Sequence, residues 1–265
     1  MYTPFQLALK YIRYYVKADN GKGHGVHSPF VFDLIQHVMN DGRQFYSFEK
    51  IEGVRVDLLK NNRSIAVEDF GAGSRVNKLP IRTIQKIAHS SLKPKKYSQL
   101  LFKLVHYFSP SHVLELGTSL GITTAYLATA NASSQVITME GSTEVAAIAL
   151  ENFQQLAINN IEIVTGNFDQ TLAITLEKLA KVDFVFLDGN HRYEPTVRYF
   201  EQVLSKTDEY AVIVLDDIHW SKEMEDAWAY VQNHQAVTLT VDLFYIGLVF
   251  FRKEKIAKQH FIIRY

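Results

Sequence analysis

The chain has 265 residues, and its 28 Lys and Arg balance its 28 Asp and Glu, so the formal net charge is zero. This balance argues against binding of nucleic acid or a membrane through bulk electrostatics, and we expect neither partner. The absence of cysteine excludes disulfides, cysteine nucleophiles and thiolate metal sites. The sequence shows no signal-peptide pattern, and no apolar stretch approaches the roughly 20 residues of a membrane helix. We therefore expect a soluble cytoplasmic protein.

Residues 1–95 are predicted to form a mainly helical extension. Apolar residues recur at helical spacing from Phe5 to Val16, and a glycine-rich loop follows at residues 20–25. Pro29 suits the first turn of a second helix over residues 30–39. The other segments expected here are helices over 81–88 and 99–108, joined by a solvated linker at 93–96. The extension is expected to cover the substrate opening as a lid, or to serve in dimerisation or packing.

From residue 109 onward, apolar runs alternate with helical patterns. Strands are expected at 113–116, 136–139, 161–164, 182–187 and 211–215, and helices at 123–130, 145–156, 171–179, 195–204 and 221–232. Two further strands, 238–241 and 248–252, have no helix between them, which predicts a terminal antiparallel pair. The pattern predicts an α/β fold with a doubly wound, mostly parallel, seven-stranded Rossmann-like sheet.

A glycine loop follows the first strand of this sheet, with Gly117 and Gly121 separated by three residues. Glycine there permits a tight turn and lets a ligand approach the N–H groups of the next helix. The dinucleotide fingerprint would require glycine at Ser119, so a nicotinamide cofactor is disfavoured. The alternative is a plain turn between strand and helix. Glu140 ends the next strand, about 20 residues after the loop, where a carboxylate can accept hydrogen bonds from ribose hydroxyls.

This part of the sequence, residues 97–252, resembles the class I S-adenosylmethionine-dependent methyltransferases. The motifs that carry the resemblance are E-x-G-x-x-x-G, Glu140 after the second strand, Gly166-Asn167-Phe168 after the third and Leu187-Asp188-Gly189 after the fourth. Within that superfamily it looks most like small-molecule O-methyltransferases of the catechol and caffeoyl-CoA type. We therefore expect a cofactor domain over residues 96–265.

The resemblance also implies roles for individual residues. Those implied to hold the methionine part of the cofactor are Glu115, Gly117, Thr118, Ser119 and Gly121. Glu140 would bind the ribose beside Gly141 and Ser142, and Gly166, Asn167 and Phe168 would lie near the adenine. Asp188 is also expected to contact the cofactor.

Acidic residues follow the fourth and fifth strands: Asp188 after one, Asp216 and Asp217 after the other. Neighbouring parallel strands end at one edge of a sheet, so these three carboxylates are expected to converge there. Oxygen ligands suit Mg²⁺ or another hard divalent cation. A hydroxyl bound to such a metal loses its proton more readily, which would prepare it for methyl transfer. Alternatively, these aspartates only cap the loops and helices that follow.

The resembling metal-dependent enzymes differ from this chain at two positions. They carry Asn where this sequence has Asp217, and a catalytic Lys where it has His191. Histidine can act as a general base near neutral pH, so Asp188 and His191 are the candidate catalytic pair. The alternative for His191 and His219 is a structural hydrogen-bonded role, and Tyr193 and Trp220 are expected to be pocket walls. No [DN]-P-P-[FY] stretch follows the fourth strand, which argues against methylation of nitrogen in nucleobases or amides.

The function predicted is transfer of a methyl group from S-adenosylmethionine to an oxygen of a small molecule. The alternatives are a non-catalytic cofactor-binding module and, less favoured, a nicotinamide-dependent oxidoreductase. A homodimer is the one protein partner considered. In the extension, His24, His27, Asp69 and Arg75 are candidate substrate contacts, and residues 68–75 are interpreted as a turn.

Overall fold

The computed structural model describes residues 1–68, 81–253 and 257–265, which group into two compact units. Unit 1 contains Met1–Asp41 and Leu176–Tyr265, and unit 2 contains Gly42–Thr175. Within the described ranges, no helix is both long enough and apolar enough to cross a membrane. The expected division into an extension (1–95) and a cofactor domain (96–265) concerns function and stays a prediction.

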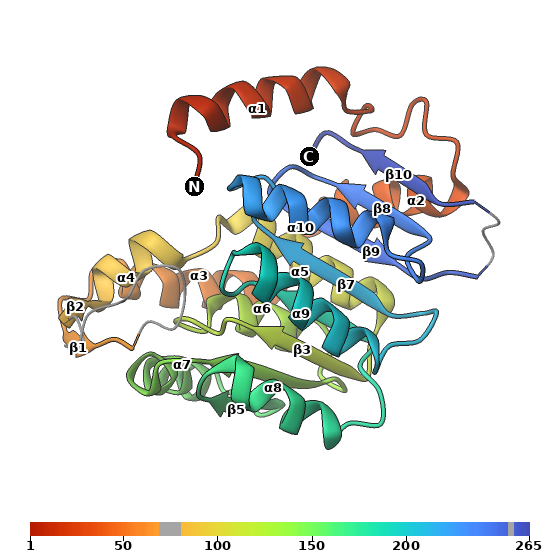
Figure 1. The fold of residues 1–265 in the computed structure, drawn as a ribbon. Helices are drawn as coiled ribbons and strands as arrows, with labels where there is room; N and C mark the ends of the chain where they lie inside the picture. The colour runs from red at the N-terminus through yellow and green to blue at the C-terminus, as the bar shows by residue number, and fades with distance from the viewer. Residues whose placement is uncertain (69–80, 254–256) are drawn as a thin grey trace. The chain divides into compact units, whose positions relative to one another are not determined.

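Unit 2 holds three parallel strands in the order β3-β4-β5: β3 (His112–Leu116), β4 (Gln135–Glu140) and β5 (Ile161–Thr165). The helices that alternate with these strands are α6 (Ile122–Ala130), α7 (Thr143–Gln155) and α8 (Phe168–Glu177), as Figure 1 shows. β3 is apolar apart from His112 and Glu115 and is buried from Val113 to Leu116, as parallel strands covered on both faces are. These elements follow the prediction to within a few residues at each end.

The N-terminal part of unit 2 contains elements that the sequence analysis did not predict. α3 (Tyr46–Leu58) was not predicted, because its apolar positions are interrupted by charged residues and Gly53. The strand β1 (Ser64–Ala66) pairs antiparallel with β2 (Ile81–Thr83). The prediction of helix from residue 81 was therefore wrong at its start: α4 (Ile84–Ser91) begins after Thr83, whose hydroxyl caps it by accepting from the Lys86 N–H. Likewise α5 (Lys95–Phe108) takes in two residues of the predicted linker.

Unit 1 holds five strands in the order β10-β8-β9-β7-β6. β6 (Phe184–Leu187) and β7 (Val212–Asp216) are parallel, and β9 (Ile246–Phe250) runs antiparallel to both β7 and β8 (Leu239–Asp242). α9 (Tyr193–Leu204) and α10 (Lys222–Asn233) follow β6 and β7. The unit also contains α1 (Pro4–Lys17), α2 (Pro29–Leu34) and a π-helical turn η1 (Ile35–Met39).

The predicted fold class is confirmed: the strands are mostly parallel, alternate with helices, and end in an antiparallel β8–β9 pair. The described residues contain eight such strands rather than seven. The additional one is β10 (Gln259–Ile262), which pairs parallel with β8. It was not predicted because the strand has only four residues, of which two are polar and two apolar.

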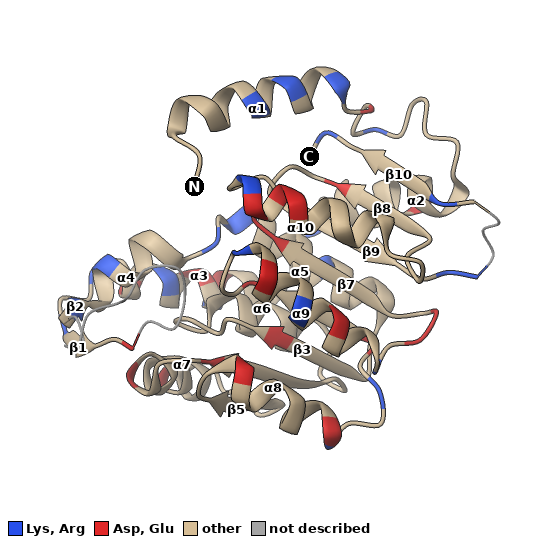
Figure 2. Ribbon diagram, in the orientation of Figure 1, with Lys and Arg blue, Asp and Glu red and all other residues tan. Residues whose placement is uncertain are grey.

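α1 is attached to unit 1 by one aromatic face. Tyr14 is 7% exposed, and its hydroxyl donates a hydrogen bond to the Ile263 carbonyl. Tyr14 and Tyr11 contact the ring of Phe244, which is buried. The helix carries basic residues and no acidic one (Figure 2).

Two glycines differ in how closely their surroundings pack, one in β9 of unit 1 and the other in α3 of unit 2. A Cβ at Gly247 in β9 would lie 2.6 Å from the buried Trp228 ring, so Gly247→Ala should destabilise the chain by about 2 kcal/mol through overpacking. Gly53 in α3 is exposed with open space around it, so Gly53→Ala should stabilise by up to about 1 kcal/mol. Urea unfolding of both variants measures the two effects, and equal midpoints would contradict the packing described here.

Candidate functional site

The loop between β3 and α6 makes a tight turn of residues 117–121. Gly117, Ser119 and Gly121 all have positive φ, at 109°, 47° and 79°. The N–H groups of Gly117 and Thr118 both donate to the carbonyl of Met139 in the neighbouring strand β4, at 2.9 and 3.0 Å. Ser119, at the position of the second glycine of the dinucleotide fingerprint, has a positive φ although it carries a side chain.

Gly121 is required for packing, whether or not the loop binds a ligand. A Cβ at Gly121 would lie 2.6 Å from the ring of Phe153 and 3.0 Å from Ala149, both on α7. Gly121 thus lets the start of α6 approach α7 closely, as the third glycine of a dinucleotide motif does between helix and strand. Its predicted cofactor role stays a prediction.

Glu140 lies at the carboxyl end of β4 and faces this loop. Its Oε2 accepts the Ser119 N–H at 2.8 Å and its Oε1 accepts the Ser142 N–H at 3.0 Å. Burial raises the pKa of Glu140, and the hydrogen bonds from the Ser142, Ser119 and Gly141 N–H groups offset only part of that shift. A carboxylate oxygen can accept more than one hydrogen bond, so Glu140 can still bind hydroxyl groups.

Glu115 is fully buried near the end of β3. One carboxyl oxygen accepts hydrogen bonds from Thr138 at 2.7 Å and from Thr124, neither of which the sequence singled out. The other oxygen, Oε1, is buried and has no hydrogen-bond partner among the described residues. Burial raises the pKa of Glu115 to about 7, against the smaller opposing effect of the two threonine hydroxyls. An unpaired buried oxygen of this kind suits a cationic or hydrogen-bond-donating ligand group.

The predicted adenine-side residues follow β5. Gly166 has φ 127° and donates its N–H to the carbonyl of Glu140 at 2.9 Å. The side chain of Asn167 accepts the Asp169 N–H at the start of α8. The adjacency of β4 and β5 therefore brings Gly166 beside Glu140, and the predicted place of Gly166 near the adenine stays a prediction.

These residues of unit 2 fit S-adenosylmethionine. The orphaned Glu115 oxygen can accept from an ammonium group, Glu140 from ribose hydroxyls, and the loop from Gly117 to Gly121 presents backbone rather than large side chains. Two neighbours that sequence reasoning missed are Ser91, whose Oγ is hydrogen-bonded to that of Ser119 at 2.8 Å, and Thr138, whose Oγ1 bonds that of Thr118 at 2.6 Å.

In unit 1, three of the predicted side chains converge. β6 and β7 are in register with Leu187 opposite Leu215, so Asp188 and Asp216 leave neighbouring strands side by side. One ligand atom each from Asp188, His191 and Asp216 lies within 4.8 Å of the others, and His191 Nε2 is 3.6 Å from Asp188 Oδ1. Two carboxylates and an imidazole can bind a divalent metal, or can hold an imidazole as a base.

Asp217 is not part of this group, although it was predicted to be a metal ligand. It has φ 53°, so the chain turns directly after Asp216. Its negative charge contributes, after burial and Tyr11, to the raised pKa of Tyr245. Asn190 and His191 also have positive φ, at 67° and 28°. Non-glycine residues in such conformations cost energy and are frequent where loops hold functional side chains.

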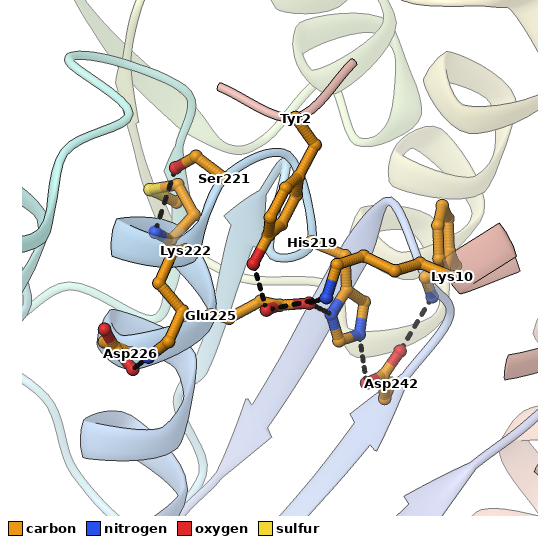
Figure 3. Close-up of polar contacts among 10 residues, drawn as sticks. Tyr2, Lys10, His219, Ser221, Lys222, Glu225, Asp226 and Asp242 are labelled. Carbon is orange, nitrogen blue, oxygen red and sulfur yellow. Dashed lines mark hydrogen bonds and ion pairs between the residues drawn. The ribbon is translucent and has the colours of Figure 1, made fainter. Parts of the chain in front are cut away.

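His219, three residues beyond Asp216, is hydrogen-bonded through both ring nitrogens, and a structural role for it stays a prediction. Figure 3 shows its ring between two carboxylates: Nε2 is 2.7 Å from Asp242 and Nδ1 is 3.2 Å from Glu225. Burial alone would lower the pKa of His219, but these two carboxylates outweigh it and raise the pKa. Lys10 of α1 and the hydroxyl of Tyr2 reach the same Glu225 carboxylate, at 2.8 and 2.7 Å.

The remaining candidates have less support. His24 and His27 are exposed, and among the described residues neither belongs to the cluster of Asp188, His191 and Asp216. Asp69, Arg75 and most of the turn interpreted at residues 68–75 lie outside the described residues. Tyr193 is 40% exposed at the start of α9, and Trp220 lies in the loop after β7.

Comparison with known proteins agrees with this arrangement. Residues 114–218 match a protein family described as a methyltransferase domain. No curated protein sequence matches the chain. Solved structures with the same fold include cofactor-bound Rv0187 from MTB, with 18% identity, TM-score 0.56, and coverage of 85% of this chain and 98% of that one.

Two further solved structures are described as O-methyltransferases. One, from Bacillus cereus in complex with SAH, has 19% identity, TM-score 0.53, and coverage of 81% of this chain and 96% of that one. The other, TomG from Streptomyces achromogenes in complex with SAM, has 15% identity, TM-score 0.56, and coverage of 82% and 95%. Residues 114–218 of this chain thus match a methyltransferase domain, and the chain shares the fold of these solved structures.

Proposed function

We propose that this protein transfers a methyl group from S-adenosylmethionine to an oxygen atom of a small molecule. The observation that carries the proposal is the convergence of Asp188, His191 and Asp216 after adjacent strands of a methyltransferase domain. Such a cluster can take the proton from an acceptor hydroxyl as a base, or can lower the pKa of that hydroxyl through a bound metal. A hydroxyl must lose its proton in this way to accept a methyl group. The descriptions of the similar Bacillus and Streptomyces proteins as O-methyltransferases support the same chemistry.

The cofactor is proposed to bind to unit 2. S-adenosylmethionine supplies an activated methyl group, so the protein has only to bind it and orient it. Glu115 would accept from the cofactor's ammonium group through its orphaned oxygen, and Glu140 would accept from the ribose. The loop from Gly117 to Gly121 and residues 166–168 would line the rest, as predicted.

The acceptor is proposed to meet the cluster of unit 1. If a divalent cation is bound, Asp188, His191 and Asp216 would hold it, and it would lower the pKa of an acceptor hydroxyl. Without a cation, His191 would take the proton, with Asp188 orienting its ring at 3.6 Å. A cytoplasmic location and the absence of a nucleic-acid partner stay part of the proposal.

Cofactor identity can be tested by calorimetry with S-adenosylhomocysteine. Glu140→Gln should weaken its binding at least tenfold, because a neutral amide accepts more weakly from ribose hydroxyls. Glu144→Gln, an exposed change one turn further along the chain, should bind as the unmodified protein does. Binding of NADH without binding of S-adenosylhomocysteine would refute the methyltransferase proposal.

The role of the cluster can be tested with EDTA and two substitutions. If a metal acts, EDTA should abolish methylation of a catechol-type probe, Mg²⁺ or Mn²⁺ should restore it, and Asp216→Asn should weaken metal binding at least tenfold. The exposed Asp226→Asn change on α10 is the matched control. If EDTA leaves the rate unchanged, the metal is excluded, and His191→Asn should then lower kcat at least a hundredfold.

The raised pKa of Glu115 makes the stability of the cofactor-free protein depend on pH. Its pKa rises from an ordinary 4.5 to about 7 on folding, so the stability it contributes is complete below pH 4.5 and is lost as pH rises through 7. Glu115→Gln stays neutral at every pH. The variant should therefore gain about 3 kcal/mol relative to the unmodified protein between pH 4.5 and pH 8, measured by urea unfolding. A difference independent of pH would show that Glu115 ionises normally.

A further inference from the structure

The outer face of α1 carries a row of exposed apolar side chains. Phe5, Leu9, Ile12 and Val16 are 73%, 42%, 58% and 73% exposed, and we call them the α1 stripe. Their spacing of four, three and four residues places all four on one side of the helix. This is the spacing of the apolar seam in a pair of packed helices.

The stripe is held in place from behind. Tyr14, on the opposite side of α1, is buried against Phe244, and Lys10 is bonded to Glu225 of α10 at 2.8 Å. α1 therefore cannot turn its apolar side inward without breaking these contacts. Four large apolar side chains fixed in this way on one helix face form a patch that a partner can cover.

The positions of the stripe are symmetric about the midpoint of the helix, between Lys10 and Tyr11. Phe5 and Val16 lie equally far from this point, as do Leu9 and Ile12. In an antiparallel pair of α1 helices related by a twofold axis, Phe5 would face Val16 of a second copy, and Leu9 would face Ile12. An isologous interface requires a surface that is complementary to itself in this way.

The charges of α1 favour the antiparallel arrangement. The helix contains Lys10, Arg13 and Lys17 and no acidic residue (Figure 2). A parallel pair would place each of these cations level with the same cation of the second copy. In the antiparallel pair, Arg13 and Lys17 would be level with Ala8 and Pro4 of the second copy, which reduces the repulsion between the two helices.

The exposed area agrees with a modest dimer. With Met1, which is 85% exposed, the stripe leaves on the order of 1,000 Å² to bury between two copies, about the lower limit for a specific interface. We propose that the α1 stripe is the interface of a homodimer in which the α1 helices of two copies pack antiparallel. The assignment does not rest on the proposed methyltransferase function.

The absence of cysteine allows a direct test by disulfide trapping. In the antiparallel pair, the two Phe5 positions would lie about 16 Å apart along the helix axis, beyond the reach of a disulfide, as would the two Val16 positions. The double variant Phe5→Cys/Val16→Cys should therefore form covalent dimers on mild oxidation, whereas neither single variant should. Efficient trapping by the single variants would indicate parallel helices and would overturn the proposal.

Sedimentation tests the stripe without cysteine. The unmodified chain should be a dimer at micromolar concentration, and Leu9→Glu/Ile12→Glu should shift it to monomer with unchanged circular dichroism. Ile174→Glu is the matched control, because Ile174 is 56% exposed on α8, close to the value for Ile12. A monomeric unmodified chain would overturn the proposal. If that monomer bound phosphatidylglycerol vesicles through the stripe, a lipid surface would be the partner instead.

Discussion

The loop between β3 and α6 depends on the hydrogen bonds that the buried carboxyl of Glu115 accepts. This carboxyl joins β3 to β4 through Thr138 and to α6 through Thr124, so the strand before the loop and the helix after it are tied to one group. A charged carboxylate with one unpaired oxygen is costly in such surroundings, and the pKa of about 7 expresses that cost. A cationic ligand would relieve it, which is why the same carboxyl serves both the fold and the proposed cofactor.

In unit 1, the register of β6 and β7 determines where the carboxylates of the cluster lie. Leu187 and Leu215 are paired in β6 and β7, and the first residue that follows Leu187 lies beside the last residue of β7. These residues are Asp188 and Asp216, so two carboxylates meet without any loop having to bring them together. His191 joins them only because the intervening chain adopts positive φ at Asn190 and at His191 itself. The cluster thus combines a regular sheet with a strained loop.

Much of this could be predicted from sequence, because parallel strands buried on both faces are continuous apolar runs and their ends are fixed by topology. Glu140 and Asp188 were located in that way. The failures have physical causes. α3 lacks a clear apolar period, β10 is short, and Asp217 leaves the cluster because a left-handed residue redirects the chain, which residue type alone does not reveal. The partners of Glu115 could have been sought in the strand pairing of Glu115 with Thr138.

The first helix shows most clearly why sequence falls short. It was interpreted as part of an extension, yet residues 1–41 group with residues 176–265. The link is a row of alternating charges, Lys10, Glu225, His219 and Asp242, each next to a partner of opposite sign. The pKa values of Lys10 and His219 are raised and that of Glu225 is lowered, because the neighbours of each group favour its charged form and outweigh the effect of burial. Removing one charge would leave the neighbouring charge partly buried without its partner of opposite sign. The row therefore holds α1, α10 and the end of β8 together. Because Lys10 and Glu225 are 215 residues apart, no local pattern could indicate this contact, and yet it fixes which face of α1 remains exposed.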